Sequence, residues 1–535
     1  MQEWECNTIA SATDKSAALW PDKVWLDFSG DKRTFAQARA EAVSLAHGLR
    51  ALGVERGDRV CSILDTSVDA VILWLALSRL GAVSVPINTA FRGEFLRHQV
   101  ADCGARLIIA DEPYLAQVQA VAGDIPSLAS ICVRGDAPAG TVSFASLRSG
   151  ESADIDVGVA PEDLAVLLYT SGTTGPSKGC MVPHSYICRM GWQSNFYIGI
   201  GHDDVYWTPC PLFHLGAAGG MIGTLQSGST MSIAPQFSVS GFWPEIERSG
   251  ATVVMLLSST LNYIADEPDT EASRRCFGKI RTIHGVPFSG KLQETWKRRF
   301  GVTNAGAVGY GMTEACSITL ADLEKPSPPG SSGRRHEDFD VEVVDGRDNI
   351  LPQGESGEIV VRPRRPGLMF QGYWNRPEAT VEVNRNLWFH TGDIGRFDEN
   401  GFLFFVDRKK DYLRRGGENI SSYELEVTFR AHPDIEDLAI HAVLSDNAED
   451  EVKITAILRP GATLAHEDLC RWSIERLPRF AVPRYIEYRD ALPRTPTGRV
   501  KKYELRAEGV TDATWDRNQS ELRPVSKRRA AAEPA

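Results

Sequence analysis

The chain has 535 residues, of which 42% are hydrophobic and 24% charged, as is usual for a globular protein large enough for two or more domains. Its net charge of −12 argues against nucleic acid as the main partner, because a phosphate backbone favours a basic surface. The N-terminus lacks the basic and apolar regions of an export signal, and the apolar run Ala70 to Leu77 is too short to cross a bilayer. We therefore expect a cytoplasmic protein without a membrane span.

Helical and strand patterns alternate between residues 33 and 112. Segment 34–53 has apolar residues at helical spacing, with Thr34 as a candidate cap and Gly53 at its end. Strands separated by helices of this length predict β-α-β units in a parallel sheet with covered faces. The same patterns assign a second helix to 67–81 and buried strands to 58–64, 82–87, 106–111, 252–257 and 279–286.

The strand patterns after residue 338 differ from those before residue 112. Segments 339–345 and 357–363 are short strands beside Gly/Pro turns, and they predict a small antiparallel sheet or barrel. The expected fold class is α/β, with a large N-terminal domain of β-α-β sheets plus a small distorted barrel, followed by a small α+β C-terminal domain. The expected boundaries are 1–408 for the first domain, 409–510 for the second and 511–535 for a disordered tail.

The ten cysteines are scattered, without a C-x-x-C pair or a Cys/His spacing typical of zinc ligands. In a protein without an export signal they are expected to be reduced thiols, most of them buried.

The segment Val166 to His184 carries an apolar strand that runs into TSGTTGPSKG. Its glycines let backbone N–H groups converge, while hydroxyls and one ammonium add donors, which is what a polyphosphate requires. Composition alone would equally describe a flexible surface loop. The order of residues differs from a Walker loop and resembles the phosphate loop of the adenylate-forming superfamily, which includes acyl-CoA synthetases, peptide-synthetase adenylation domains and firefly luciferase. The resemblance assigns ATP binding to Thr170, Ser171, Gly172, Thr173, Thr174, Gly175 and Lys178.

The segment GYGMTEA, Gly309 to Ala315, is similar to the next motif of that superfamily. The resemblance implies that Tyr310 stacks on adenine, Thr313 binds the α-phosphate and Glu314 binds Mg²⁺. A single carboxylate is enough for Mg²⁺ when phosphate oxygens and water supply the other ligands. Standing alone, the segment would be typical of a helix start with Thr313 as cap. The ATP-binding residues expected from this motif are Tyr310, Gly311, Met312 and Thr313.

Further motifs follow in the order that the superfamily has. Thr391-Gly392-Asp393 resembles its TGD element, in which the aspartate (here Asp393) holds the ribose hydroxyls, and Arg408 is implied to contact the ribose as well. Lys410 takes the hinge position between the domains. Gly416-Gly417-Glu418-Asn419 resembles the loop that forms one wall of the coenzyme A tunnel, so CoA binding is assigned to Gly416, Gly417 and Glu418.

Two pocket-lining stretches are also similar. PLFHLGA, 211–217, resembles the segment whose His gates the CoA tunnel, here His214, although a lone His can equally be a packed core residue. HGVPFSG, 284–290, stands where relatives have a small-residue run beside adenine, which implies Gly285, Val286 and Pro287, with Val286 departing from the pattern. The expected acyl pocket consists of Trp192, Phe213, Thr260, Phe288, Gly309, Met312 and Cys316.

The resemblance implies a two-step reaction. A carboxylate attacks the α-phosphate of ATP and releases pyrophosphate, and the thiol of CoA then attacks the acyl-adenylate and releases AMP. Bringing two anions together is an electrostatic problem, so cations and donors are needed rather than a nucleophilic side chain. The expected catalytic residues are Lys178, Thr313, Glu314, Arg499 and Lys501.

The segment TPTGRVKKYEL, 495–505, departs from the family at the chemistry. Most relatives have a lysine after this glycine, whereas Arg499 stands here, and a planar guanidinium is not equivalent to a compact ammonium. We expect Arg499 to act with Lys501 contributing, if the loop is extended. If the helix has already begun, Lys502 is the nearer substitute, and an inactive relative is the third alternative.

The acyl pocket is expected to be roomy and mainly apolar, because glycine and sulfur-bearing residues line it. That favours a medium-chain, alicyclic, steroid-like or aryl acid over acetate. The stretches GGENISSYELE and GLMFQGYWNRPEAT look like those of the crotonobetaine/carnitine-CoA ligase-like branch, which does not fix the substrate. Free CoA is the expected acceptor, since no carrier domain follows residue 508. The alternatives are an enzyme that loads a carrier protein and a non-catalytic nucleotide-binding relative; a homodimer stays open.

Overall fold

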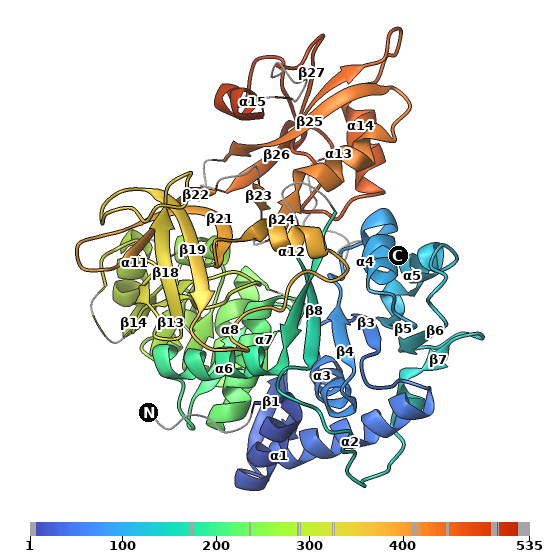
Figure 1. The fold of residues 1–535 in the computed structure, drawn as a ribbon, viewed down its shortest axis with the longest axis vertical. Helices are drawn as coiled ribbons and strands as arrows, with labels where there is room; N and C mark the ends of the chain where they lie inside the picture. The colour runs from blue at the N-terminus through green and yellow to red at the C-terminus, as the bar shows by residue number, and fades with distance from the viewer. Residues whose placement is uncertain are drawn as a thin grey trace. The chain divides into compact units, whose positions relative to one another are not determined.

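A computed structural model describes residues 7–170, 176–234, 237–285, 288, 290–323, 325, 327–408, 412–415, 418–445, 449–493, 500 and 502–522 (Figure 1). The chain forms two compact units. The large unit comprises Met1–Thr89, Arg97–Thr170 and Lys178–Lys409, and the small unit comprises Ala90–Leu96, Ser171–Ser177 and Lys410–Ala535.

Two seven-stranded sheets form the frame of the large unit. Their strands pair in parallel except for one antiparallel edge hairpin in each sheet, β8 with β9 and β1 with β2. The first sheet has the spatial order β7 (Val142–Ser143), β6 (Ser130–Arg134), β5 (Leu107–Asp111), β3 (Arg59–Ile63), β4 (Val83–Pro86), β8 (Leu164–Thr170), β9 (Lys178–Pro183). The second has the order β14 (Asn304–Gly306), β13 (Thr282–His284), β12 (Val253–Met255), β10 (Val205–Thr208), β11 (Thr230–Ile233), β1 (Val24–Phe28), β2 (Asp31–Thr34).

Helices connect these strands, as the β-α-β pattern predicted. The predicted cap at Thr34 is confirmed: its side chain accepts the Gln37 N–H, and the Gln37 side chain accepts the Thr34 N–H. The second predicted helix ends at Gly81, whose φ of 64° is the left-handed conformation that glycine tolerates. The helices are α1 (Ile9–Leu19), α2 (Phe35–Ala51), α3 (Val68–Leu80), α4 (Gly93–Asp102), α5 (Leu115–Ala122), α6 (His184–Ile198), α7 (Leu215–Ser227), α8 (Val239–Ser249), α9 (Ser258–Asp266), α10 (Glu271–Arg275), α11 (Gly290–Phe300) and α12 (Pro377–Val383).

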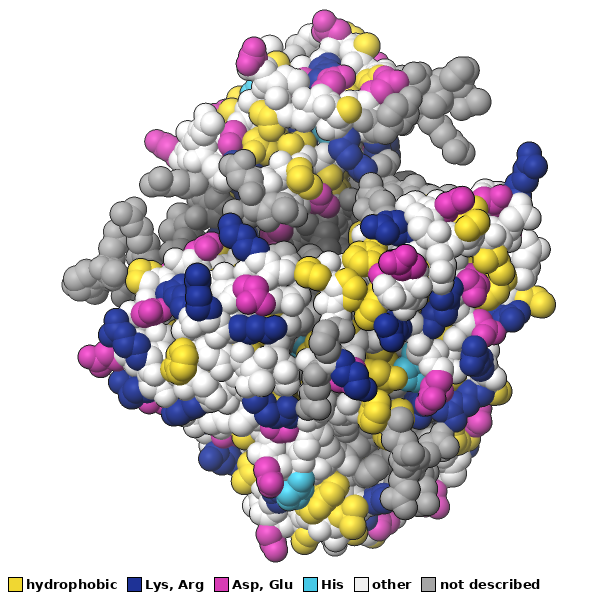
Figure 2. Space-filling view, turned by 90° about the vertical axis from the view of Figure 1, so that its left-hand side faces the viewer, with side chains coloured by type: hydrophobic (Ala, Val, Ile, Leu, Met, Phe, Trp, Pro, Cys, Tyr) yellow, Lys and Arg dark blue, Asp and Glu magenta, His cyan; other side chains and the backbone are white. Residues whose placement is uncertain are grey.

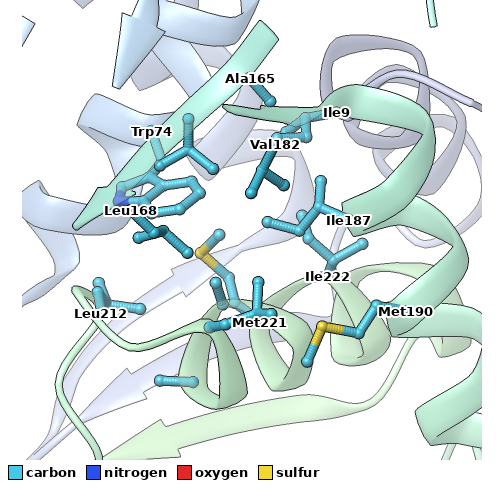
Figure 3. Packing of buried hydrophobic residues seen from close by; sticks show 14 of the residues in the cluster. Ile9, Trp74, Ala165, Leu168, Val182, Ile187, Met190, Leu212, Met221 and Ile222 are labelled. Atoms are coloured by element: carbon cyan, nitrogen blue, oxygen red, sulfur yellow. The ribbon is translucent and has the colours of Figure 1, made fainter. Parts of the chain in front are cut away.

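The main core of the large unit lies where α6 and α7 meet the β8–β9 hairpin. Figure 3 shows side chains from β8, β9, α3, α6 and α7 converging there, among them Leu168, Val182 and Met221. Helices α6 and α7 approach closely because glycines face each other: a Cβ on Gly191 would lie 2.8 Å from the backbone N of Gly223. This packing holds β8 and β9, the two strands that border the TSGTTGPS loop.

The predicted small antiparallel region is present after residue 308. It contains one three-stranded and one five-stranded sheet. The first has the order β15 (Gly309–Tyr310), β16 (Thr319–Leu320), β17 (Arg334–Arg335); the second has β18 (Phe339–Val344), β19 (Gly357–Pro363), β21 (Trp388–Phe397), β20 (Asn384–Arg385), with β22 (Leu403–Arg408) also paired to β21. The expected α/β fold class with a small curled antiparallel part is thus confirmed.

The small unit is an α+β structure with its own core. It has a two-stranded sheet and a four-stranded sheet, in which only the β26–β27 pair is parallel. Its elements are β23 (Tyr412–Arg415), β24 (Glu418–Ser421), α13 (Ser422–Arg430), β25 (Ile435–Leu444), β26 (Asp450–Leu458), α14 (His466–Ile474), β27 (Tyr485–Tyr488), α15 (Lys502–Glu508) and β28 (Trp515–Asp516).

A buried ion pair ties the end of α15 to this four-stranded sheet. The Lys453 ammonium donates to Glu487 Oε2 at 2.5 Å, to the Gly509 carbonyl at 2.7 Å and to Thr514 Oγ1 at 3.0 Å. Burial alone would raise the pKa of Glu487. Hydrogen bonds, of which the one from Lys453 is the strongest, outweigh burial and hold the pKa at about 2. The pair therefore fixes the residues that follow α15.

The surface of the large unit is mixed in charge. On the face in Figure 2, Lys and Arg side chains are interspersed with Asp and Glu. Among the residues that the structure describes, none of the helices combines the length and the apolar character that crossing a membrane demands.

We predict that Lys453→Met destabilises the small unit by about 3–5 kcal/mol, because Glu487 is left buried without its counter-charge. The measurement is hydrogen–deuterium exchange of β25–β28 over a urea series, which reports the free energy of opening of that unit. The matched control is Arg476→Met in the same unit, which removes an exposed pair with Glu475 and should cost about 1 kcal/mol or less. An equal effect of both changes would contradict the role given to Lys453.

Candidate active site

The two ends of the expected phosphate loop are fixed by strand pairing. Thr170 at the end of β8 stands opposite Lys178 at the start of β9. The Thr170 hydroxyl lies 3.7 Å from Cys180 Sγ, so this end of β8 is also held to β9 through side chains. The loop residues Ser171, Gly172, Thr173, Thr174 and Gly175 lie outside the described residues.

Tyr373 links the two charged groups expected to act on ATP. The Lys178 ammonium lies 4.9 Å from the centre of the Tyr373 ring, and the Tyr373 hydroxyl donates to Glu314 Oε1 at 2.8 Å. Tyr373 and Glu314 are buried, with exposed fractions of 7% and 9%. Because a cation is attracted to the face of an aromatic ring, Tyr373 positions Lys178 while it hydrogen-bonds Glu314.

Tyr373 reaches this place because residues 371–374 run beside β9. Met181 N–H donates to Gly372 O at 3.0 Å, and Trp374 N–H donates to Gly179 O at 2.8 Å. The sequence alone singles out the GLMFQGYWNRPEAT stretch without giving Tyr373 a role. The residue is far from Lys178 and Glu314 in the chain. This pairing with β9, together with the hydrogen bond from Phe370 N–H to Glu314 O at 3.0 Å, brings it to them.

The GYGMTEA segment is held in place by a tyrosine of α6, Tyr186. The Tyr186 hydroxyl donates to the Thr313 carbonyl at 3.1 Å and accepts the Cys316 N–H at 2.6 Å. Burial raises the pKa of Tyr186 well above its usual value, so the hydroxyl stays protonated and can donate. A Cβ on Gly311 would lie 2.5 Å from Ser317 N, which explains the glycine. The backbone around Thr313 and Glu314 is therefore held in one conformation.

The residues expected at adenine and ribose lie together. The Tyr310 hydroxyl donates to Asp393 Oδ2 at 2.7 Å, and both residues are buried. In the β21–β22 pair, Asp393 stands opposite Arg408, so the backbone brings the two expected ribose contacts to one position. Of the three residues expected beside adenine, Gly285 follows β13. Val286 and Pro287 lie outside the described residues.

Glu358 supports the TGD element, a role that sequence reasoning missed. Its Oε1 accepts the Gly392 N–H at 3.2 Å, and its Oε2 lies 3.1 Å from His390 Nδ1. The Thr391 hydroxyl completes the turn by accepting the Asp393 N–H at 3.1 Å and donating to Ile359 O at 2.7 Å. The only sequence signal is an acid at the start of the apolar strand GEIVVRP.

The residues assigned to the acyl pocket make different contacts within the large unit. Met312 and Cys316 are partly buried at the edge of the main core, and Phe213 contacts His214, with ring centres 4.7 Å apart, just before α7. Thr260 lies in the first turn of α9, where its hydroxyl donates to Leu257 O at 2.7 Å.

Two residues assigned to the pocket make their contacts elsewhere in the large unit. Phe288 is buried in the apolar cluster that α8, α9 and α11 form on the outer side of the second sheet. Trp192 stacks on Phe196, with ring centres 6.0 Å apart, and the Arg189 guanidinium lies 4.0 Å from its ring centre. Both of these contacts are made within α6.

The interpretation of Gly309 as a sign of a roomy pocket was wrong. A Cβ at this position would lie 2.0 Å from the Thr319 carbonyl of the neighbouring strand. The glycine is therefore required by the β15–β16 pairing, and its lack of a side chain says nothing about the size of the acyl pocket.

In the small unit, Lys502 is bound to α13. Its ammonium donates to Ser422 Oγ at 2.8 Å and lies 2.6 Å from Glu426 Oε1. Glu426 also accepts the Ile440 N–H at 3.0 Å. Glu418 begins β24, opposite Arg415. Arg499, Lys501, Lys410, Gly416 and Gly417 lie outside the described residues.

Comparison with known proteins identifies the family. Residues 13–374 match the model of the family described as AMP-binding enzyme. The chain belongs to this family. Crotonobetaine/carnitine–CoA ligase of Salmonella arizonae is 30% identical over 511 residues, which cover 92% of this chain and 98% of the relative.

Two solved structures of similar proteins share this fold. One is o-succinylbenzoate CoA synthetase (MenE) from Bacillus subtilis, a double mutant bound to a product analogue, with 25% identity and a TM-score of 0.80 over 93% of this chain and 98% of that one. The other is ATP-bound MatB from Rhodopseudomonas palustris, with 28% identity and a TM-score of 0.67 over 93% and 98%. As an AMP-binding enzyme, the protein binds ATP.

The chemistry of Glu314 suits a divalent cation in this AMP-binding enzyme. It offers one buried carboxylate, oriented by Tyr373. A Mg²⁺ ion commonly takes one or two protein carboxylates and completes its shell with phosphate oxygens and water. Among the described residues, no three His, Cys, Asp or Glu gather into a closed metal cluster.

We predict that Tyr373→Phe lowers the rate of adenylate formation about tenfold and raises the Mg²⁺ concentration for half-maximal rate, because Glu314 loses the donor that orients it. The ring is kept, so Lys178 retains its aromatic contact. The measurement is pyrophosphate exchange over a Mg²⁺ series. Tyr488→Phe is the control, since the buried Tyr488 hydroxyl has no hydrogen-bond partner among the described residues; an unchanged Mg²⁺ dependence in Tyr373→Phe would contradict the assignment.

We predict that Glu358→Ala raises the KM for ATP about tenfold with a smaller change in kcat, because the turn that presents Asp393 loses its acceptor. Steady-state kinetics with varied ATP measure this. Glu342→Ala on the same sheet is the control, because Glu342 pairs with Arg335 near the surface. The role of Glu358 fails if both variants show the same KM.

Proposed function

We propose that the protein is an AMP-forming acyl-CoA ligase that activates a carboxylic acid as its acyl-adenylate and passes the acyl group to coenzyme A. The observation that carries this is the Lys178–Tyr373–Glu314 arrangement beside the Tyr310–Asp393 pair. It supports the proposal because a cation, a carboxylate suited to a metal ion and a carboxylate suited to ribose hydroxyls all belong to one AMP-binding enzyme. The names of the similar proteins support the same reaction class.

In the first step, a carboxylate oxygen of the acid attacks the α-phosphorus of ATP, and the bond to pyrophosphate breaks. Lys178 neutralises phosphate charge, and Thr313 donates to the α-phosphate. Mg²⁺ bound at Glu314 would withdraw charge from the phosphate oxygens. Asp393, with Arg408, holds the ribose, and Tyr310 packs against adenine, so the nucleotide is oriented for in-line attack.

In the second step, the CoA thiol attacks the acyl carbonyl and AMP leaves. We propose that His214 and the Gly416-Gly417-Glu418 loop line the path of the CoA arm. This step requires the small domain (409–510) to turn about Lys410 relative to residues 1–408, as hinge motions in enzymes do. The compact units divide between Lys409 and Lys410, which supports a hinge there.

We propose Arg499 as the group that bridges the substrate carboxylate and the α-phosphate, with Lys501 contributing. The contacts of Lys502 support this choice, because its ammonium is already paired with Glu426 and Ser422 inside the small unit. A lysine held by a buried carboxylate is a poor candidate for a mobile catalytic cation. A planar guanidinium can span two oxygens, one on each reacting group.

The function is tested by ATP–pyrophosphate exchange over a panel of medium-chain, alicyclic, steroid-like and aryl acids, followed by thioester formation with CoA. Exchange together with CoA thioester is the expected result. Exchange without CoA thioester would indicate transfer to a carrier protein. No exchange with any acid would indicate a non-catalytic nucleotide-binding protein.

We predict that Arg499→Ala lowers pyrophosphate exchange at least about a hundredfold, because removal of one charge-stabilising group at a transition state costs that much. Lys502→Ala should lower exchange far less and should instead reduce the stability of the small unit, since it breaks the contact with Glu426. Exchange rates and thermal unfolding are measured on both variants. Equal or reversed effects on exchange would reject the assignment.

A further inference from the structure

His284 is a buried titratable residue that the proposed mechanism does not use. It ends β13 and has an exposed fraction of 8%. Its Nε2 atom is buried and has no hydrogen-bond partner among the residues that the structure describes. Buried polar atoms are nearly always hydrogen-bonded, so Nε2 is open to a group that a ligand brings if the ring lies beside a binding site.

Strand register shows which face of the second sheet carries His284. It stands opposite Met255 on β12 and Gly306 on β14, and side chains at paired positions of parallel strands point to the same face. The Tyr206 ring on β10 lies 6.0 Å from the His284 ring, and the Tyr206 hydroxyl donates to Met255 Sδ at 3.2 Å. Ile283, the preceding residue, points to the opposite face and belongs to the outer apolar cluster.

The face that carries His284 leads toward Gly309, a residue of the expected acyl pocket. Met255, on that face, packs in one small apolar cluster with Val308, the residue that precedes Gly309. A Cβ on Gly216, two residues after His214, would lie 2.9 Å from Met255 Cε. Parallel sheets bind ligands beyond the carboxyl ends of their strands, and His284 is the last residue of its strand.

The His284 ring is neutral under ordinary conditions, because burial lowers its pKa to about 4. A neutral imidazole carries one N–H donor and one acceptor nitrogen. It can therefore bind a hydroxyl or a carbonyl oxygen without requiring a charged partner.

We propose that His284 is a specificity-determining residue whose imidazole hydrogen-bonds an oxygen on the tail of the carboxylic acid. The substrate class is then a carboxylic acid with a hydroxyl or carbonyl group remote from its carboxylate, rather than an unsubstituted alkyl or aryl acid. This inference rests on the proposed function. It selects, among medium-chain, alicyclic, steroid-like and aryl acids, those that carry such an oxygen.

The test uses pairs of acids that differ by one oxygen, such as cyclohexanecarboxylate with its 4-oxo and 4-hydroxy derivatives, and octanoate with oxo- and hydroxyoctanoates. The ratio of kcat/KM within a pair is measured by pyrophosphate exchange. The wild-type protein should favour the oxygenated member of at least one pair about tenfold to a hundredfold, since a site built to hydrogen-bond a substrate group discriminates against the analogue without it.

His284→Phe should bring that ratio to near unity, mainly by loss of kcat/KM for the oxygenated acid. His284→Gln, which keeps a hydrogen-bonding nitrogen, should retain part of the preference. Because each ratio is taken within one variant, a smaller folded fraction does not change it.

His184→Phe is the matched control. His184 is also buried, its Nε2 also lacks a partner among the described residues, and burial lowers its pKa to about 4 as well. It begins α6 and accepts the Ile9 N–H at 3.4 Å, so its loss should affect stability but not the ratio.

Equal activation of both members of every pair by the wild type, or a preference that survives His284→Phe, would overturn this inference while leaving the proposed function standing. No exchange with any acid would reject the proposed function and this inference together.

Discussion

The candidate site depends on Tyr373 standing between Lys178 and Glu314. A lysine and a buried glutamate attract each other, and a direct ion pair between them would leave neither charge free for a ligand. The ring face holds the ammonium, and the hydroxyl holds the carboxylate. Both charges thus keep fixed positions but stay available, the cation for phosphate and the carboxylate for a metal ion.

Buried tyrosine hydroxyls play a similar part in the rest of the site. Tyr186 fixes the backbone at Thr313 and Cys316, and Tyr310 holds Asp393. A tyrosine hydroxyl donates without carrying charge, so it can orient a carboxylate or a carbonyl without competing for the anionic nucleotide. Because these donors are neutral, the positive charge of the site comes from the groups proposed to bind phosphate.

The parts of the fold that local chemistry determines could be predicted from the sequence. The start of α2 and the end of α3 depend on residues within one turn, the β-α-β pattern depends on periodicity, and motif resemblance located Glu314. Tyr373 and Glu358 were missed because their partners are distant in the chain: Tyr373 lies 59 residues from Glu314, and Glu358 lies 34 from Gly392. Backbone hydrogen bonds between segments distant in the chain bring these residues to their partners. The wrong interpretation of Gly309 has the same origin, because a glycine in a motif can provide room for a ligand or for a neighbouring strand.

Two lysines of the small unit, Lys502 and Lys453, anchor the helix α15. Lys502 pairs with Glu426, which in turn accepts a backbone N–H from β25, so the first turn of α15 is anchored to α13 and to the sheet. Lys453 anchors the other end of the same helix through the Gly509 carbonyl. The role proposed for Arg499 requires its charge to meet the reacting phosphate in a fixed orientation, because transition-state stabilisation depends on orientation. A helix that begins at Lys502 and is fixed at both ends suits that requirement.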